Sequence, residues 1–376
     1  MTSLNRRQYL AVAGTGVSGG LAGCVGSLEE AISDDSHVLE TDGPVSVDWS
    51  HALADDAVGR PTVSGTTIAV GGRDGEVTAV DVESHETEWV YDGTPTRDPF
   101  PVASNDEYVF VWDVDHVEAI QWENGSVHWQ SERVSASMES VRYGSLAVDG
   151  TLLYAGVEHP TAFDADTGDL RWENRNLDGR SEPPVFEDDG MYVPTQDGVA
   201  VLDRTDGSIV EGSPDGSPLR YQQDELYSMA RPSVTDDEVA FQAGDVYVYE
   251  RGTNDLRWRV EVEGQNHGLV CTDETVFVPS RTELLGLDLQ DGSYRTSYDV
   301  GTFDIVTTPI VEGDSVYVGC RNDTAEEGKL YAFDTTSRDT NWRVSVDEQL
   351  RTEPVFHEGT IYIAGTDHLF ALTEET

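Results

Sequence analysis

Hydrophobic residues in this chain recur in short alternating runs, with no long helical periodicity. The segment from Pro309 to Val318 shows the pattern: an apolar run, a polar turn at Gly313 and an alternating Val-Tyr-Val run. Apolar alternation bounded by turn residues is typical of β-strands. Similar segments begin at Pro61, Pro101, Pro184, Pro232 and Pro354. The sequence therefore predicts an all-β protein built from a repeated unit.

A second pattern places a tryptophan ten positions after a small residue. Its clearest copy runs from Ala162 through Gly168 to Trp172. The same offset joins Ala79 to Trp89, Ala119 to Trp129 and Ala332 to Trp342, with weaker copies from Ala200 to Val210, Val248 to Trp258 and Gly286 to Thr296. We interpret the small residue as leaving room for an indole that stacks on the neighbouring unit, and the glycine as supplying a positive φ in a tight turn. Where tryptophan is lost, at Val210 and Thr296, we expect a looser contact.

The last copy contains Ala371 but ends before its tryptophan, whereas Trp49 precedes the first complete copy. Counting Trp49, eight equivalent positions are spaced 38 to 48 residues apart. Four short strands with their turns occupy about 40 residues, which is one propeller blade. Because a closed ring leaves no sheet edge exposed, we predict an eight-bladed β-propeller of four-stranded antiparallel blades over residues 45–376. The N-terminal strand would join the C-terminal blade.

The repeat resembles the pyrroloquinoline quinone (PQQ)-like β-propeller repeat family. Residues 162–172 match its docking motif, AxDxxTGxxxW, at every specified position. The resemblance covers residues 45–376 and implies the propeller fold. It implies less about function, because the family includes quinoprotein dehydrogenases, the lipoprotein that assists outer-membrane β-barrel assembly in bacteria, and uncharacterised binding proteins.

The charge balance changes the picture of the environment. The chain has 72 acidic and 23 basic residues, a formal net charge of −49, and Lys329 as its only lysine. Such a chain would be repelled by nucleic acid, which excludes a general nucleic-acid binder. Dispersed carboxylates repel one another in dilute buffer but are screened at molar salt. We interpret the composition as that of a haloarchaeal protein; a locally acidic partner surface fits less well, since the acids run from Glu29 to Glu375.

The first residues carry two targeting patterns. Arg6 and Arg7 precede a weakly apolar, glycine-rich run that ends in Leu-Ala-Gly-Cys24. This order resembles a twin-arginine export signal with a lipobox. We predict an export signal over residues 1–23, a membrane lipid attached to Cys24, and an acidic tether over 24–44, which would place the protein on the outer face of the cell membrane. A non-cleaved anchor fits less well, because no later stretch approaches the ~20 apolar residues of a membrane span.

The sequence contains little catalytic chemistry. Quinoprotein dehydrogenases of the family that it resembles cover PQQ with two adjacent cysteines and hold Ca²⁺ nearby, whereas Cys271 and Cys320 are 49 residues apart. The acidic run at 164–169 lacks the twelfth-position glutamate of a calcium loop and is expected to be a turn. The nine histidines show no close pairing of metal-ligand type. No catalytic residue, metal, PQQ or Ca²⁺ is predicted. Asn124 and Asn322 lie in glycosylation sequons whose occupancy the sequence leaves open.

One arginine pattern points to binding. Arginines fall just before the predicted first strand of many blades: Arg60, Arg97, Arg142, Arg180, Arg231 and Arg351, with His267 in the equivalent loop of the sixth blade. First strands line the central channel, so these side chains would form a cationic funnel for carboxylate, sulfate or phosphate groups. Phe100, Tyr143 and Tyr221 would form its walls. Alternatively, each arginine pairs with an acid such as Asp98, Glu139 or Glu182 and only fixes its loop, which is the more ordinary outcome.

We therefore predict a non-catalytic, lipid-anchored scaffold that binds an extracytoplasmic or membrane protein, or a ligand, through its channel-mouth loops. The predicted partner-specific surfaces are the insertions around Tyr221 to Met229 and Asp323 to Gly328. The alternative is a PQQ- and Ca²⁺-dependent quinoprotein dehydrogenase that acts on an alcohol or a sugar.

Overall fold

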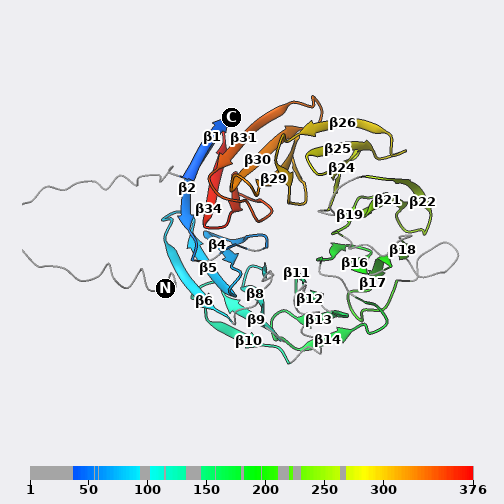
Figure 1. The fold of residues 1–376 in the computed structure, drawn as a ribbon. Coiled ribbons are helices and arrows are strands. Elements are labelled where there is room, and N and C mark those ends of the chain that lie inside the picture. Colours follow the sequence, from blue (N-terminus) through cyan, green and yellow to red (C-terminus); the bar gives the residue numbers. More distant parts are fainter. Residues whose placement is uncertain are drawn as a thin grey trace, which may run out of the picture. The chain divides into compact units, whose positions relative to one another are not determined.

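The regular structure consists of β-strands arranged as eight antiparallel sheets around a central axis (Figure 1). The prediction of an eight-bladed propeller is confirmed. This computed structural model describes residues 37–54, 56–57, 59–93, 102–113, 116–132, 145–156, 158–178, 182–195, 197–210, 220–222, 230–262 and 268–375. Within these ranges no helix is long and apolar enough to cross a membrane.

The first four blades follow one another along the chain, and each pairs its strands in sequence order. Blade 1 consists of β3 (Thr62–Ser64), β4 (Thr67–Gly71), β5 (Glu76–Asp81) and β6 (Thr87–Asp92). Blade 2 consists of β7 (Val102–Ser104), β8 (Tyr108–Asp113), β9 (His116–Gln121) and β10 (Val127–Gln130). Blade 3 consists of β11 (Ser145–Asp149), β12 (Leu152–Gly156), β13 (Pro160–Asp164) and β14 (Leu170–Glu173). Blade 4 consists of β15 (Val185–Glu187), β16 (Gly190–Thr195), β17 (Gly198–Leu202) and β18 (Arg220–Gln222).

The last four blades complete the ring, and the two final ones also use the N-terminal segment. Blade 5 consists of β19 (Ser233–Val234), β20 (Glu238–Ala243), β21 (Asp245–Glu250) and β22 (Leu256–Val260). Blade 6 consists of β23 (Val270–Cys271), β24 (Thr275–Pro279), β25 (Glu283–Asp288) and β26 (Tyr294–Asp299). Blade 7 consists of β27 (Asp304–Ile305), β28 (Ile310–Glu312), β29 (Ser315–Asn322), β30 (Glu327–Asp334), β31 (Thr340–Val346) and β1 (Val38–Asp42). Blade 8 consists of β32 (Val355–His357), β33 (Thr360–Ala364), β34 (His368–Glu374) and β2 (Val45–Ala52).

Closure of the ring depends on β2. It pairs antiparallel with β34, from Val45 opposite Glu374 to Ala52 opposite His368, with Trp49 opposite Ala371. Figure 1 shows the two strands side by side although they come from opposite ends of the chain. The predicted closure by the N-terminal strand is confirmed, and it completes blade 8 as a four-stranded sheet.

The folded part begins before residue 45, which differs from the predicted tether of 24–44. Residues 38–42 form β1, which pairs with β31 at the outer edge of blade 7. The turn into β2 passes through Gly43 at φ +96°, where a Cβ atom would lie 2.7 Å from Cβ of Trp342. Because only glycine fits this position, the N-terminal segment can bind blade 7 and then blade 8 in immediate succession.

In blades 1, 2, 3 and 5 the repeated tryptophan joins its blade to the next. In blade 2, Trp129 lies opposite Ala119 and donates its indole N–H to the carbonyl oxygen of Ala165 in blade 3, at 2.9 Å. Its ring covers Gly168, where a Cβ atom would lie 2.5 Å from Cε3. The same arrangement recurs for Trp89 on Gly125, Trp172 on Gly207 and Trp258 on Gly292. The glycine thus supplies both the positive φ and the space that the indole needs.

The aspartate of the repeat motif closes the turn that presents this glycine. Oδ1 of Asp164 accepts hydrogen bonds from the backbone N–H groups of Asp166 and Thr167, at 3.0 and 3.1 Å. Arg171 pairs with the other carboxylate oxygen at 2.7 Å. This hydrogen bond and those from the backbone lower the pKa of Asp164. The segment 164–169 is therefore a turn, as the sequence predicted, and its leading carboxylate is already in use.

Tyrosine replaces tryptophan where the motif departs from its pattern. In blade 4 the residue opposite Ala200 is Arg220, so the predicted position at Val210 is wrong. The hydroxyl of Tyr221 accepts a hydrogen bond from the Gly252 N–H of blade 5, at 3.1 Å, and the ring is fully buried. Tyr221 is therefore a blade-docking residue and not a channel wall. In blade 6, Tyr298 donates to the carbonyl oxygen of Asp334 at 2.9 Å.

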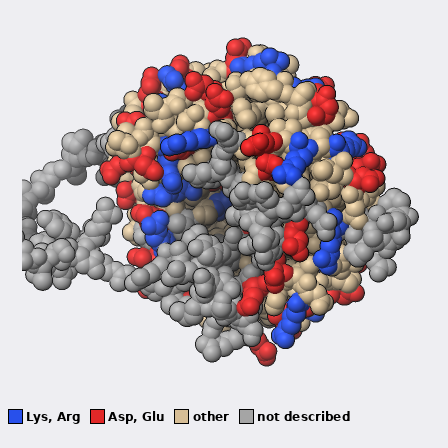
Figure 2. Space-filling view, turned by 45° about the vertical axis from the view of Figure 1, so that its right-hand side comes forward, with Lys and Arg blue, Asp and Glu red and all other residues tan. Residues whose placement is uncertain are grey.

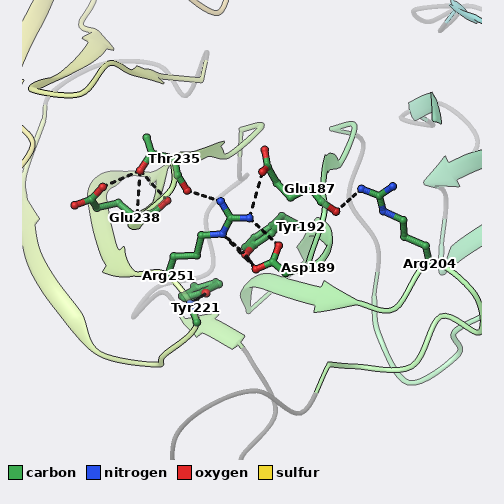
Figure 3. A network of polar contacts seen from close by, with 9 residues as sticks. Glu187, Asp189, Tyr192, Arg204, Tyr221, Thr235, Glu238 and Arg251 are labelled. Carbon is green, nitrogen blue, oxygen red and sulfur yellow. Dashed lines mark hydrogen bonds and ion pairs between the residues drawn. The ribbon is translucent and has the colours of Figure 1, made fainter. Parts of the chain in front are cut away.

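Arg251 strengthens the same contact between blades 4 and 5 (Figure 3). It donates from Nη2 to Asp189 at 2.8 Å and from Nε to the Tyr192 hydroxyl at 3.0 Å, and both partners belong to blade 4. It also donates from Nη1 to the carbonyl oxygen of Thr235 in its own blade at 2.6 Å. The contact at blade 4 is therefore rebuilt from polar and aromatic groups, and the expected loosening does not describe it.

Replacing Gly168 by alanine tests the docking contact, with Gly301→Ala as a matched control. The two glycines have φ angles of +76° and +74°, but a Cβ atom at Gly301 would meet nothing within 4 Å. Gly301→Ala should cost about 1 kcal/mol, the penalty of a positive φ. Gly168→Ala should cost about 1–3 kcal/mol more, because the methyl group displaces Trp129. Denaturant unfolding in molar KCl measures both; equal losses would contradict the docking role.

Truncation from the N-terminus tests the closure. A protein that begins at Gly43 lacks β1 and should unfold a few degrees lower, still as a monomer. A protein that begins at Leu53 also lacks β2, whose Trp49 and Val45 are 7% and 4% exposed. Burial of each such side chain contributes about 1.5–3 kcal/mol, and the bare edge of β34 invites association. Circular dichroism and size-exclusion chromatography check this; a monomer with unchanged thermal unfolding would disprove it.

Candidate functional site

Four charged residues indicate a candidate binding site at the mouth of the central channel. Arg60, Glu182, Arg231 and Glu353, which we call the channel cluster, each lie two or three residues before the innermost strand of blades 1, 4, 5 and 8. Each directly precedes a proline, which holds the residue in extended backbone conformation. Blades 1 and 5, and likewise 4 and 8, are opposite in a ring of eight. The four loops thus bring these charges together around the axis.

Electrostatic interactions indicate that these side chains lie close enough to act on one another's charge. The charge of Arg231 acts on both Arg60 and Glu182, and the charge of Glu353 acts on the same two groups. The pKa of Arg60 is lowered, first by burial among protein atoms and then by Arg231, whereas Glu353 opposes the change. The Arg60 side chain is nevertheless exposed to solvent. Together these observations place it in a water-accessible opening that protein surrounds.

The two arginines of the channel cluster lack ion pairs in the described part of the chain, as does Arg351. Most other described arginines are paired, such as Arg171 with Asp164, Arg257 with Glu238 and Arg295 with Asp288. Unpaired arginines are unexpected in a chain with 72 acidic residues. They leave two guanidinium groups with free donors, which suit carboxylate or phosphate oxygens.

Glu182 is the titratable member of the channel cluster near neutral pH. The pKa of its carboxyl is raised to about 7, first by burial and then by the charge of Glu353, and Arg231 partly offsets both effects. The alternative prediction pairs Glu182 with an arginine, but Glu182 forms no ion pair among the described residues. Its protonation would leave the channel cluster with two cations and one anion.

Arg351 belongs to a second group. Its pKa is lowered by burial and by the charges of Arg321 and Arg73, whereas Asp56 and Asp323 oppose this. Arg73 pairs with Asp56 at 3.6 Å and Arg321 with Asp323 at 3.0 Å. Figure 2 shows acidic and basic side chains interspersed over one face, with a hollow at its centre. The described arginines of the predicted set are thus divided, with Arg60 and Arg231 in the channel cluster and Arg351 in this second group.

Several predicted residues lie outside the described part of the chain. They are Arg97, Arg142, Arg180 and His267 of the arginine pattern, Phe100 and Tyr143 of the walls, Asp98 and Glu139 of the alternative, and Arg6, Arg7 and Cys24 of the targeting segment. The channel cluster therefore contains only residues that the structure describes.

Two features of the sequence could have identified further site residues that were not predicted. Glu182 and Glu353 precede prolines just as Arg60 and Arg231 do, so a search for any charge before these prolines would have found them. The structure further brings together Asp113, His116 and Glu118 at the turn between β8 and β9. The prediction considered histidine pairs and missed this mixed cluster, whose spacing is D-x-x-H-x-E.

Both described cysteines are free thiols. Cys320 is fully buried and Cys271 is partly buried. Burial raises the pKa of Cys271 to about 12 and that of Cys320 further. The thiolate is the reactive form of cysteine, and a raised pKa disfavours that form. These cysteines therefore fill space in the blades as small apolar side chains do.

Comparison with known proteins gives the fold and the family. Among solved structures, BamB from Moraxella catarrhalis has a TM-score of 0.66 at 14% identity, covering 88% of this chain and 97% of that one. A computationally designed protein has a TM-score of 0.66 at 14% identity, with 89% and 99% covered. Quinohemoprotein alcohol dehydrogenase from Comamonas testosteroni has a TM-score of 0.67 at 12% identity, with 88% and 76% covered. At these identities the likeness shows the fold alone.

Comparison of the amino-acid sequence identifies the family as well as the fold. No curated protein sequence matches the chain. A family profile described as "Outer membrane protein assembly factor BamB" matches residues 37–210 and 113–319, which together span most of the chain. The predicted resemblance to the PQQ-like repeat family is therefore confirmed, and the protein belongs to the BamB-like family of PQQ-type repeat propellers.

Proposed function

We propose that this protein is a non-catalytic scaffold, anchored by a lipid on Cys24 to the outer face of the cell membrane, which binds an acidic segment of a protein partner at the channel cluster. The observation that carries the proposal is the pair of unpaired arginines, Arg60 and Arg231, at the channel mouth of a strongly acidic protein. Leaving two such groups partly desolvated and without a direct ion pair to a described residue has a cost to stability. A ligand that supplies carboxylates offsets that cost.

The scaffold role is supported by the family and by the rigidity of the ring. The matching family profile is described as an assembly factor. An assembly factor acts by binding other proteins, and this general role is the one that we propose. Blade-to-blade docking fixes the loops that carry Arg60 and Arg231 on opposite sides of the axis. Preorganised donors lose little entropy on binding. Arg6, Arg7 and the Leu-Ala-Gly-Cys24 pattern support export and lipid attachment.

The second candidate is a PQQ-dependent dehydrogenase, which the likeness to quinohemoprotein alcohol dehydrogenase favours. We place it second because the adjacent cysteines that cover PQQ in those enzymes are absent from the sequence. Dye reduction with PQQ, Ca²⁺ and an alcohol or a sugar would decide in its favour, whereas cross-linking in high salt that captures a membrane or extracytoplasmic protein would favour the scaffold.

Replacing Arg60 and Arg231 together by glutamine should weaken the binding of an oligoglutamate peptide at least tenfold. Each guanidinium–carboxylate hydrogen bond contributes about 1.5–3 kcal/mol, and 1.4 kcal/mol is about a factor of ten in affinity. Fluorescence anisotropy in molar KCl measures the affinity. Arg338→Gln is the control, since Arg338 is an exposed arginine without an ion pair in the turn between β30 and β31. Equal affinities for all three proteins would exclude the site.

Binding of the same peptide should strengthen as the pH falls from about 8 to about 6. Glu182 has a pKa near 7, so protonation removes a negative charge from the channel cluster in this range. Since its pKa is raised on folding, the contribution of Glu182 to stability is full below the ordinary carboxyl pKa and is lost as the pH rises through about 7. Glu182→Gln should remove both pH dependences, and a pH profile unchanged by this substitution would contradict the assignment.

A further inference from the structure

A second cluster of polar side chains lies away from the channel cluster, within blade 2. Asp113 ends β8, and His116 and Glu118 begin β9 after the turn between these strands. One ligand-type atom from each side chain lies within 4.8 Å of the other two. The side chains are largely buried, with exposed fractions of 11%, 17% and 10%. Hairpin geometry thus brings an imidazole and two carboxylates to one point.

The distances suit a metal ion as well as a hydrogen bond. Nε2 of His116 lies 3.1 Å from Oε1 of Glu118 and 4.0 Å from Oδ2 of Asp113. Ligand atoms about 2.1 Å from a tetrahedral zinc ion are about 3.4 Å apart. The two measured separations lie on either side of that value. Small side-chain movements would therefore place all three atoms around one ion.

Neighbouring groups hold Glu118 in the orientation that ligation needs. The Tyr91 hydroxyl, on β6 of blade 1, donates to Oε2 at 2.8 Å and leaves Oε1 facing His116. Metal-binding carboxylates commonly have such an outer hydrogen bond. The partners of Glu118 within the described residues are Tyr91, His116 and Gln130. Neither arginine nor lysine is among these described partners, in contrast to Glu238, which Arg257 neutralises.

Gln130 offers a fourth donor. Its side-chain amide, on β10, contacts Nε2 of His116 and lies 3.1 Å from Oε1 of Glu118. Amide oxygen and nitrogen exchange places on rotation of the group, so the oxygen can face the same point. Three strands of blade 2 would then contribute one nitrogen and three oxygen atoms.

We propose that Asp113, His116 and Glu118, with Gln130 as a fourth ligand, bind a divalent transition-metal ion of the Zn²⁺ type. The imidazole selects against Ca²⁺ and Mg²⁺, which prefer oxygen ligands alone, and favours first-row transition ions. The ion would neutralise the carboxylates and, through Tyr91, connect blade 2 to blade 1. Its role is structural and independent of the channel cluster.

Titration of the metal-free protein with Zn²⁺ tests this proposal, in molar KCl with excess Mg²⁺ to occupy non-specific carboxylate sites. Isothermal titration calorimetry should show one saturable site per chain. Co²⁺ should give the visible absorption of a low-symmetry site and be displaced by Zn²⁺. Zn²⁺ should also raise the midpoint of thermal unfolding. Absence of saturable binding would overturn the proposal.

Variants separate this site from the many other acids. His116→Ala should weaken Zn²⁺ binding at least a hundredfold. Tyr91→Phe, which keeps the ring and all ligands, should weaken it about tenfold through the lost outer hydrogen bond. His368→Ala is the control, because His368 also pairs with a buried glutamate, Glu348, at 2.8 Å. Binding lost in the control or retained in both His116→Ala and Tyr91→Phe would overturn the assignment, whether or not His116→Ala is destabilised.

Discussion

The pairing of β2 with β34 is the interaction on which the rest of the structure depends. Eight blades face a common axis only if the ring is closed, and closure requires residues 45–52 to lie against residues 368–374. The opposition of blade 1 to blade 5 and of blade 4 to blade 8 follows from it. Without that opposition Arg60 and Arg231 would belong to separate loops with no common ligand. The proposed binding site is thus a property of the closed ring and not of any single blade.

Docking between blades gives this ring its rigidity, and one geometric requirement is met in more than one way. Tryptophan over a turn glycine joins four pairs of neighbouring blades, at Trp89, Trp129, Trp172 and Trp258, and the glycine is required because the indole occupies the space of a Cβ atom. At blade 4, Tyr221 and Arg251 perform the same task with a hydroxyl and a guanidinium. At blade 1, where His85 replaces the glycine at φ +61°, its ring stacks on Trp49 with centroids 4.8 Å apart. What is kept is a filled and hydrogen-bonded contact between blades.

The sequence predicted the features that arise from local repetition. Alternating runs and the Ala-to-Trp offset are readable because strand pairs and turns use residues close in the chain, and the orphan Trp49 predicted closure. Contacts between residues that are far apart in the sequence could not be predicted from it. The outer strand of blade 4 begins at Arg220 and not near Val210, so offset counting failed there. The interaction of Glu182 with Glu353 joins blades 4 and 8, which are far apart in the chain and lie opposite each other only in the closed ring.

The order in which the chain is made gives closure a further meaning. β2 is among the first strands to be synthesised, and its partner β34 is the last. Contacts between such distant segments form slowly, because a long loop must close before they contribute. During that interval β2 and the edge of the most recently made blade have unpaired backbone groups. Until β34 is made, the unfinished ring can therefore pair with another copy of the chain, and closure removes that risk.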